Sequence, residues 1–192
     1  MRLGVFGGSF NPPHVGHFLI ASDAFEALGL DRLLIVPAAA NPLKGAAPAA
    51  LPSDRLRMAE MTFAGDPRFE VSSMEIERGG LSYTVDTLEA LAAQYAGAEL
   101  VLLLGMDAMR TIEKWKRPDR IRELARLAVL TRGGETEPLP GGVEAVTTRR
   151  IDVSSTEIRS RVAAGLPIRG FVIDSVEKFI STAKLYAGNS NA

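Results

Sequence analysis

The two histidines of the chain, His14 and His17, lie three positions apart in residues 7–17, which have the sequence GGSFNPPHVGH. The segment follows a short apolar run and opens a stretch of helical period, so both imidazoles can point the same way from a helix start. The glycines let a ligand approach the backbone, and the N–H groups at a helix start favour an anion. The segment therefore predicts an anion-binding site.

Three other interpretations of this segment remain open. The histidines could cap or pack against the helix, the glycines could form only a tight turn, or the imidazoles could bind a metal. The metal site has little support, because no third histidine, cysteine or HExxH-type glutamate accompanies the pair. The segment contains no GxxxxGKS/T or GxGxxG motif, and it lacks the last glycine of a GxSxG nucleophile elbow.

The elements that must position these residues alternate between short apolar runs and longer segments of helical period. This alternation predicts an α/β fold, a Rossmann-like doubly wound parallel sheet with helices on both faces. In such a sheet, ligands bind outside the carboxyl ends of the strands, where the histidine segment begins. We expect extended segments at 3–6, 32–36, 69–76, 100–104, 126–131 and 143–146, and helices at 15–28, 54–63, 85–95, 155–164 and 175–182.

Two stretches have the composition of loops. Residues 38–52 contain several prolines and alanines, and residues 133–142 have the sequence GGETEPLPGG. Long connections of this kind tend to be functional or mobile. Neither stretch divides the chain convincingly, so we expect a single domain over residues 1–192, with C-terminal helices at 154–186 completing the nucleotide site implied below.

Composition excludes several classes of function. The 192 residues include no cysteine, which rules out a disulfide framework, a thiolate zinc site and a cysteine nucleophile, and which fits a cytoplasmic location. The formal net charge of −1 argues against a dedicated nucleic-acid-binding protein. No apolar run approaches the roughly 20 residues of a membrane span, and glycine appears too early for a signal peptide. We expect small-molecule partners.

The sequence GGSFNPPHVGH resembles the signature of the nucleotidyltransferases that carry an HxGH motif on a Rossmann-like fold. A second signature of these enzymes, I/V-SSTxIR, matches residues 153–159, VSSTEIR. Within this superfamily the chain most resembles the bacterial nicotinate-nucleotide adenylyltransferases, in order from Leu3 to Tyr186. The narrower resemblance is carried by SYTVDTL at 82–88, LGMD at 104–107, the lone Trp115, and the patterns around 174–176 and 185–186.

The resemblance implies transfer of the AMP portion of ATP to nicotinate mononucleotide, which gives nicotinate adenine dinucleotide and pyrophosphate. The attacking phosphate monoester has a second pKa of about 6, so it needs no general base. The expected mechanism is direct in-line attack without a covalent enzyme intermediate, driven by positioning and electrostatics. Alternatives are a related HxGH transferase that uses nicotinamide mononucleotide or phosphopantetheine, and a nucleotide-binding sensor without catalysis.

The resemblance also implies the residues of the ATP site. His14 and His17 would be the catalytic donors to the phosphates, with His17 on the α-phosphate. Ser154 with Glu157 also matches a helix capping box, which is the structural alternative for the second motif. No cluster of Asp and Glu residues suggests a protein-built metal site, so Mg²⁺ should arrive on the ATP phosphates. The expected ATP-binding residues are Gly8, Ser9, Phe10, His14, His17, Gly105, Asp107, Ser154, Ser155, Thr156 and Arg159.

For the mononucleotide, the resemblance implies that Trp115 stacks on the nicotinate ring. The helix start at Tyr83 and Thr84 offers N–H groups to the ring carboxylate, unless Ser82 or Thr84 is an ordinary cap. Asp107 would accept hydrogen bonds from ribose hydroxyls, or else cap the following helix. The expected mononucleotide-binding residues are Lys44, Tyr83, Thr84, Asp107, Trp115 and Arg132.

One loop departs from the family pattern. The family commonly has a PPHK/R element after the second strand, whereas residues 37–44 here are PAAANPLK. Leu43 stands in place of the histidine, and Lys44 retains a positive charge for the mononucleotide phosphate. Asn11, where many relatives have aspartate, is a smaller departure.

Overall fold

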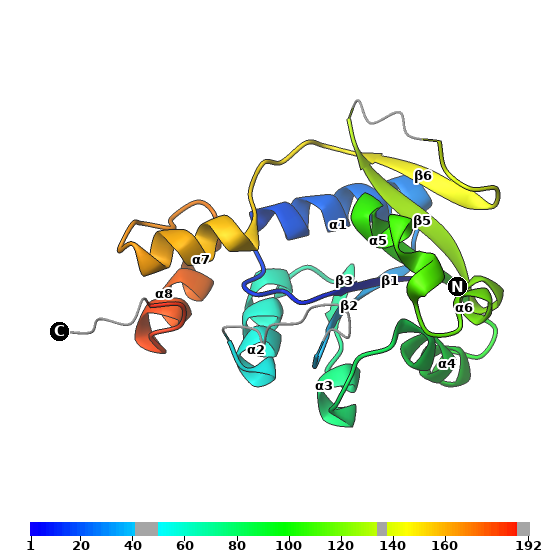
Figure 1. The fold of residues 1–192 in the computed structure, drawn as a ribbon, viewed down its shortest axis with the longest axis horizontal. Helices are drawn as coiled ribbons and strands as arrows, with labels where there is room; N and C mark the ends of the chain where they lie inside the picture. Colours follow the sequence, from blue (N-terminus) through cyan, green and yellow to red (C-terminus); the bar gives the residue numbers. More distant parts are fainter. Residues whose placement is uncertain (41–49, 134–137, 188–192) are drawn as a thin grey trace.

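In the computed structural model, which describes residues 1–40, 50–133 and 138–187, six parallel strands form one sheet in the order β3-β2-β1-β4-β5-β6 (Figure 1). The strand order reverses at β1, which pairs with β2 on one side and β4 on the other. This order confirms the predicted doubly wound Rossmann-like sheet. The strands are β1 (Arg2–Gly8), β2 (Arg32–Pro37), β3 (Phe69–Val71), β4 (Glu99–Gly105), β5 (Ala125–Arg132) and β6 (Val143–Thr148).

The helices agree with the expected ranges wherever the helical period is long. The first helix begins and ends at the predicted residues, and Gly29 closes it in the left-handed conformation at φ 57°. The extended segment predicted at 69–76 is wrong in its second half, because the strand ends at Val71 and a helix begins at Met74. The helices are α1 (Val15–Leu28), α2 (Pro52–Phe63), α3 (Met74–Arg78), α4 (Thr84–Gln94), α5 (Met106–Arg110), the 3₁₀-helix η1 (Ile112–Lys114), α6 (Pro118–Leu124), α7 (Ser155–Ala163) and α8 (Asp174–Thr182).

Helices cover both faces of the sheet, as predicted. Along β4, Leu102 and Leu104 join the core under α4 and α6, while Val101 and Leu103 join the core under α1. Successive side chains of a strand point to opposite faces, so a continuous apolar run is what a strand buried on both faces requires.

A third apolar cluster lies beyond the sheet and joins α2 to the C-terminal helices α7 and α8, which Figure 1 shows at the end of the molecule next to α2. Its buried members include Met58 on α2, Ile158 on α7 and Val176 on α8. The backbone N–H of Val15 also donates to the carbonyl of Phe171 at 3.0 Å. The C-terminal segment is therefore anchored beside the start of α1. Within the described residues, no helix has the length and apolarity that crossing a membrane would need.

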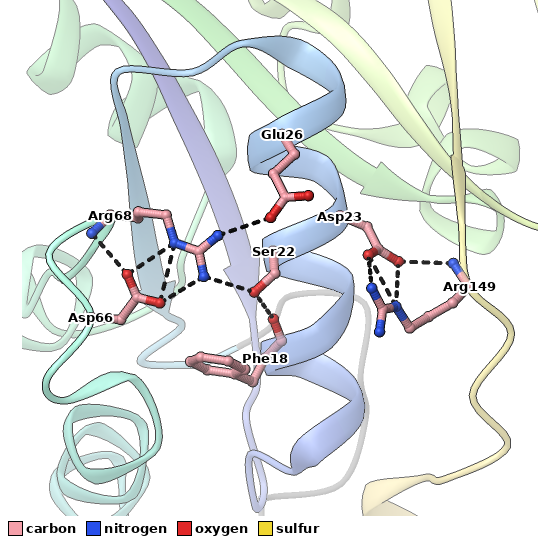
Figure 2. Close-up of polar contacts among 7 residues, drawn as sticks. All are labelled: Phe18, Ser22, Asp23, Glu26, Asp66, Arg68 and Arg149. Atoms are coloured by element: carbon pink, nitrogen blue, oxygen red, sulfur yellow. Dashed lines mark hydrogen bonds and ion pairs between the residues drawn. The ribbon is translucent and has the colours of Figure 1, made fainter.

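Charged side chains hold α1 on opposite sides (Figure 2). On one side, Asp23 accepts hydrogen bonds from the backbone N–H of Arg149 at 2.9 Å and from its guanidinium at 2.6 Å. On the other, Arg68 contacts Glu26 at 3.2 Å and Asp66 at 2.7 Å. Hydrogen bonds from the two arginines lower the pKa values of Asp23 and Asp66. These contacts fix the direction of the helix that begins at the histidine segment.

Candidate functional site

The turn that joins β1 to α1 carries the histidine motif at the carboxyl end of the sheet. The turn brings Phe10 into the left-handed region at φ 46°, where a non-glycine residue costs about 1 kcal/mol, yet its ring is buried. That ring packs 5.0 Å from the His17 ring, measured between centroids. The turn is therefore held by packing in a conformation that the chain would not adopt alone.

The two histidines form a stacked and hydrogen-bonded pair. The backbone N–H of His14 donates to Nδ1 of His17 at 3.2 Å, and the ring centroids are 3.8 Å apart. His14 is the N-cap residue of α1, so capping, one of the alternatives from the sequence, is part of the geometry. Because Nδ1 of His17 accepts a hydrogen bond, the proton of its neutral ring is on Nε2. His17 can thus donate a hydrogen bond to a ligand through Nε2.

Burial keeps both imidazoles uncharged at neutral pH. It lowers the pKa of His14 to about 4, and it holds the pKa of His17 well below the ordinary 6.5, with the neighbouring His14 adding a smaller effect. The pair therefore offers neutral N–H donors. An anion that binds beside the pair would raise both pKa values, since it favours the charged form.

Gly16, between the two histidines, is required by close packing. A Cβ atom at this position would lie 2.9 Å from Nδ1 of His14 and 3.4 Å from Ile151. The first of these distances is shorter than Cβ contacts allow, so a larger residue would displace the His14 ring. The glycine of the HxGH pattern thus makes room for the first histidine.

The second motif contacts the first, although the two are far apart in sequence. The Ser155 hydroxyl donates to the carbonyl of Pro12, 143 residues away, at 2.8 Å. The Arg159 guanidinium donates to the carbonyl of Asn11 at 2.8 Å and to the Thr156 hydroxyl at 3.2 Å. The two motifs therefore lie side by side, and α7 holds the histidine turn.

Other residues of the C-terminal segment have structural contacts. The Ser154 side chain accepts the backbone N–H of Glu157 at 3.1 Å, so it caps α7, which was the structural alternative for this motif. The buried Tyr186 hydroxyl donates to Oδ1 of Asn11 at 2.7 Å, and burial raises the pKa of that hydroxyl. The segment thus reaches the histidine turn from both α7 and the residues after α8.

Arg55 is a residue of this region that the sequence analysis did not identify. Its side chain is only 1% exposed, and it donates to the carbonyls of Ser9 and Ala39, each at 2.8 Å. Burial lowers the pKa of the guanidinium, and within the described residues its Nε has no hydrogen-bond partner. The available signal was helical spacing, which places Arg55 on the same face of α2 as Met58 and Phe63.

A cavity of about 330 Å³ lies where the strand order reverses, between the carboxyl ends of β1 and β4. This is the usual ligand position in a doubly wound sheet. Five of the predicted residues line it, and residues that were not predicted line it as well, among them Glu75, Lys114 and Lys116. The predicted residues in its wall are Gly8, Tyr83, Thr84, Gly105 and Trp115.

The aromatic wall of this cavity is held by polar contacts. The Trp115 indole N–H donates to the Thr111 hydroxyl at 3.3 Å. The Lys116 ammonium lies 4.6 Å from the centre of the Tyr83 ring and 2.9 Å from the Asp86 carboxylate. Tyr83 precedes α4 without a side-chain cap, so Ser82 and Thr84 do not have the ordinary capping role.

The structure does not bring every predicted residue to the cavity. The Asp107 side chain is 98% exposed and pairs with Arg110 at 3.0 Å, so it is not part of the cavity wall. Lys44 lies outside the described residues, as does the side chain of Arg132 in β5. Across the described ranges there is no group of three His, Cys, Asp or Glu residues that could hold a metal ion.

Comparison with known proteins first shows the class of enzyme to which this chain belongs. A family model described as cytidylyltransferase-like matches residues 5–161, a range that includes the histidine turn, the cavity and most of α7. The chain is a member of this nucleotidyltransferase class, as the two motifs indicated.

Curated relatives then give the particular family. The probable nicotinate-nucleotide adenylyltransferase of Gemmatimonas aurantiaca is 50% identical over 97% of this chain and 92% of its own length. The protein of the same name from a Roseiflexus species is 44% identical over 96% of this chain and 97% of its own length. This chain belongs to the nicotinate-nucleotide adenylyltransferase family, which confirms the resemblance found in the sequence.

A solved structure shares the fold at much lower sequence identity. The nicotinic acid mononucleotide adenylyltransferase of Plasmodium falciparum, complexed with NaAD, superposes with a TM-score of 0.80 at 15% identity, covering 96% of this chain and 97% of that one. The sheet and its helices are therefore common to both proteins.

Proposed function

We propose that this chain transfers the adenylyl group of ATP to nicotinate mononucleotide, as the names of its relatives indicate. One observation carries the proposal, which is that Gly8 both lines the cavity and leads into the histidine turn. A mononucleotide in the cavity would thus direct its phosphate toward a triphosphate bound at the turn. An oxygen of that phosphate forms a bond to the α-phosphorus of ATP. The bond between the α-phosphorus and the oxygen that bridges it to the β-phosphate breaks, and pyrophosphate leaves with that oxygen.

In this mechanism His14 and His17 donate hydrogen bonds to the triphosphate, with Nε2 of His17 directed at the α-phosphate. Charge accumulates on the phosphate oxygens in the transition state, so donors placed there lower the barrier. The attacking phosphate is mostly dianionic at neutral pH and needs no base. The remaining proposed ATP ligands are the turn residues Gly8, Ser9 and Phe10, Gly105 at the end of β4, Asp107 in α5, and the residues Ser154, Ser155, Thr156 and Arg159 at the start of α7.

Magnesium belongs to this proposal as an ion carried by the triphosphate, where it would neutralise charge on the leaving pyrophosphate. The histidine turn suits such a complex, because its two imidazoles are neutral. The phosphate oxygens could therefore accept hydrogen bonds from the protein and bind the magnesium ion at the same time.

At the cavity, we propose that Trp115 stacks on the nicotinate ring and that the N–H groups at Tyr83 and Thr84 bind its carboxylate. Lys44 remains a proposed ligand of the mononucleotide phosphate, Asp107 a proposed acceptor from the ribose hydroxyls, and Arg132 a proposed mononucleotide-binding residue. The same proposal includes a cytoplasmic location and one domain over residues 1–192. We also propose that residues 154–186 complete the ATP site, and the contact of Ser155 with Pro12 supports this role.

The test is to incubate the purified protein with Mg²⁺–ATP and, separately, nicotinate mononucleotide, nicotinamide mononucleotide or phosphopantetheine, while pyrophosphate release is followed. The highest kcat/KM is expected with nicotinate mononucleotide, with the dinucleotide identified by its mass. A faster reaction with phosphopantetheine, or ATP binding without turnover for any acceptor, would contradict the proposal.

A further inference from the structure

A buried carboxylate, Glu75, lies in the wall of the cavity. The side chain is 7% exposed, and its Oε1 accepts the Thr87 hydroxyl at 2.6 Å. Thr87 in turn accepts a hydrogen bond from Arg78 at 2.9 Å. In the described part of the chain, Glu75 takes part in no ion pair of 4.0 Å or less, and the Arg78 guanidinium lies on the far side of the Thr87 hydroxyl. A carboxylate removed from water is unfavourable unless something compensates its charge.

The other acidic groups near this wall are already engaged. Asp86 pairs with Lys116 at 2.9 Å, and Glu77 is exposed on the outer side of α3, where it accepts the Ser73 hydroxyl. Glu75 therefore differs from its neighbours, because among the described residues it is the acidic residue that lines the cavity. The bond from Thr87 accounts for one oxygen only, and a glutamine could accept that bond equally well.

The proposed acceptor carries a positive charge that a carboxylate in the cavity wall would attract. In a nicotinate mononucleotide the ring nitrogen has a third substituent, the ribose, and the aromatic ring is therefore a cation with a carboxylate at another position. A cationic ring is attracted both by a carboxylate and by the face of a tryptophan. Glu75 and Trp115 line the same cavity.

We infer that Glu75 is a specificity-determining residue that recognises the positive charge of the pyridinium ring. The inference rests on the proposed function and adds a requirement to it, namely that the ring be cationic. The site thus excludes rings of the same shape without that charge, such as a benzoate or a reduced dihydropyridine. Lys114, a cation in the same wall, is available to the ring carboxylate.

The test compares two ligands that differ only in ring charge, nicotinate mononucleotide and the 5′-phosphate of a benzoate C-riboside. Binding is followed by the fluorescence of Trp115, the single tryptophan of the chain. The natural protein should bind the pyridinium about tenfold more tightly, a difference of about 1.4 kcal/mol. Glu75→Gln should remove this preference by weakening pyridinium binding alone. The control, Glu77→Gln, removes the same charge from the same helix and should leave both affinities unchanged.

A Glu75→Gln protein that keeps the preference would overturn the inference, and so would an equal loss of affinity for both ligands, which indicates a structural role. Turnover is measured in the same samples. If the natural protein binds the pyridinium preferentially but releases no pyrophosphate, the proposed function fails while the role of Glu75 stands. If it binds neither ligand, both fail.

Discussion

The backbone N–H of His14 donates to Nδ1 of His17 at 3.2 Å, and the two rings are stacked with their centroids 3.8 Å apart. This relationship determines the chemistry of the turn in two ways. It places the proton of the neutral His17 ring on Nε2, and it adds the effect of a neighbouring imidazole to the burial that lowers the pKa of His17. The pair acts through oriented neutral donors until an anion arrives.

The low pKa of His14 predicts how stability depends on pH. Its folded pKa is about 4 and its ordinary value 6.5, so between these values the unfolded chain binds the proton and the folded chain does not. The free energy of unfolding should therefore fall as pH falls from 6.5 to 4, by up to about 3 kcal/mol from this residue. Urea denaturation at several pH values should show a smaller pH dependence for His14→Gln. An unchanged pH dependence would contradict the burial of a neutral ring.

Arg55→Met should destabilise the protein although the two side chains have similar length. The carbonyls of Ser9 and Ala39 lose their donors, at a cost of about 1–3 kcal/mol. The turn after β1 should also become less ordered, so kcat should fall. Chemical denaturation and steady-state kinetics test both effects. A variant as stable and active as the natural protein would show that the buried guanidinium does not hold the turn.

Ser155→Ala should raise the KM for ATP about tenfold, because it removes the bond to Pro12 and a hydroxyl proposed to contact phosphate. Ser160→Ala changes an exposed serine of the same helix and is the matched control. Initial rates over a range of ATP concentrations separate the two variants. The same KM for ATP in both variants would show that Ser155 does not contribute to ATP binding.

Trp115→Ala should raise the KM for nicotinate mononucleotide while leaving the KM for ATP nearly unchanged. Loss of ring stacking costs about 1–3 kcal/mol, which is at least a fivefold change. Trp115→Phe should retain part of the stacking, so its KM for nicotinate mononucleotide should lie between those of the natural protein and of Trp115→Ala. Equal increases in both KM values would instead indicate that the tryptophan supports folding.

The sequence predicted the sheet well because its strands and long helices have clear patterns. The run from Leu100 to Leu104 is apolar on both faces, and the segment from Val15 to Leu28 has a full helical period with a glycine after it. The short helices were not predicted, since α3 and α5 have only five residues each and show no complete period. At 69–76, the serines after Val71 end the strand earlier than the apolar pattern suggested.

For the site, motifs located the residues but not their contacts. Both motifs were identified, yet only the fold shows that Ser155 and Arg159 bind the backbone of the histidine turn. Arg55 and Glu75 were missed because charged residues are normally exposed, and their burial depends on distant segments. The exposed position of Asp107 depends likewise on the short α5, which the pattern did not predict.

The central claim is that Nε2 of His17 donates to the α-phosphate in the transition state, and His17→Asn tests it most directly. An asparagine side chain can still accept the N–H of His14, but it lacks a group at the position of Nε2. The measurement is kcat with both substrates saturating, alongside the KM for nicotinate mononucleotide. We expect kcat to fall by about 10²–10³-fold with that KM nearly unchanged. A kcat within a few-fold of the natural protein would contradict it.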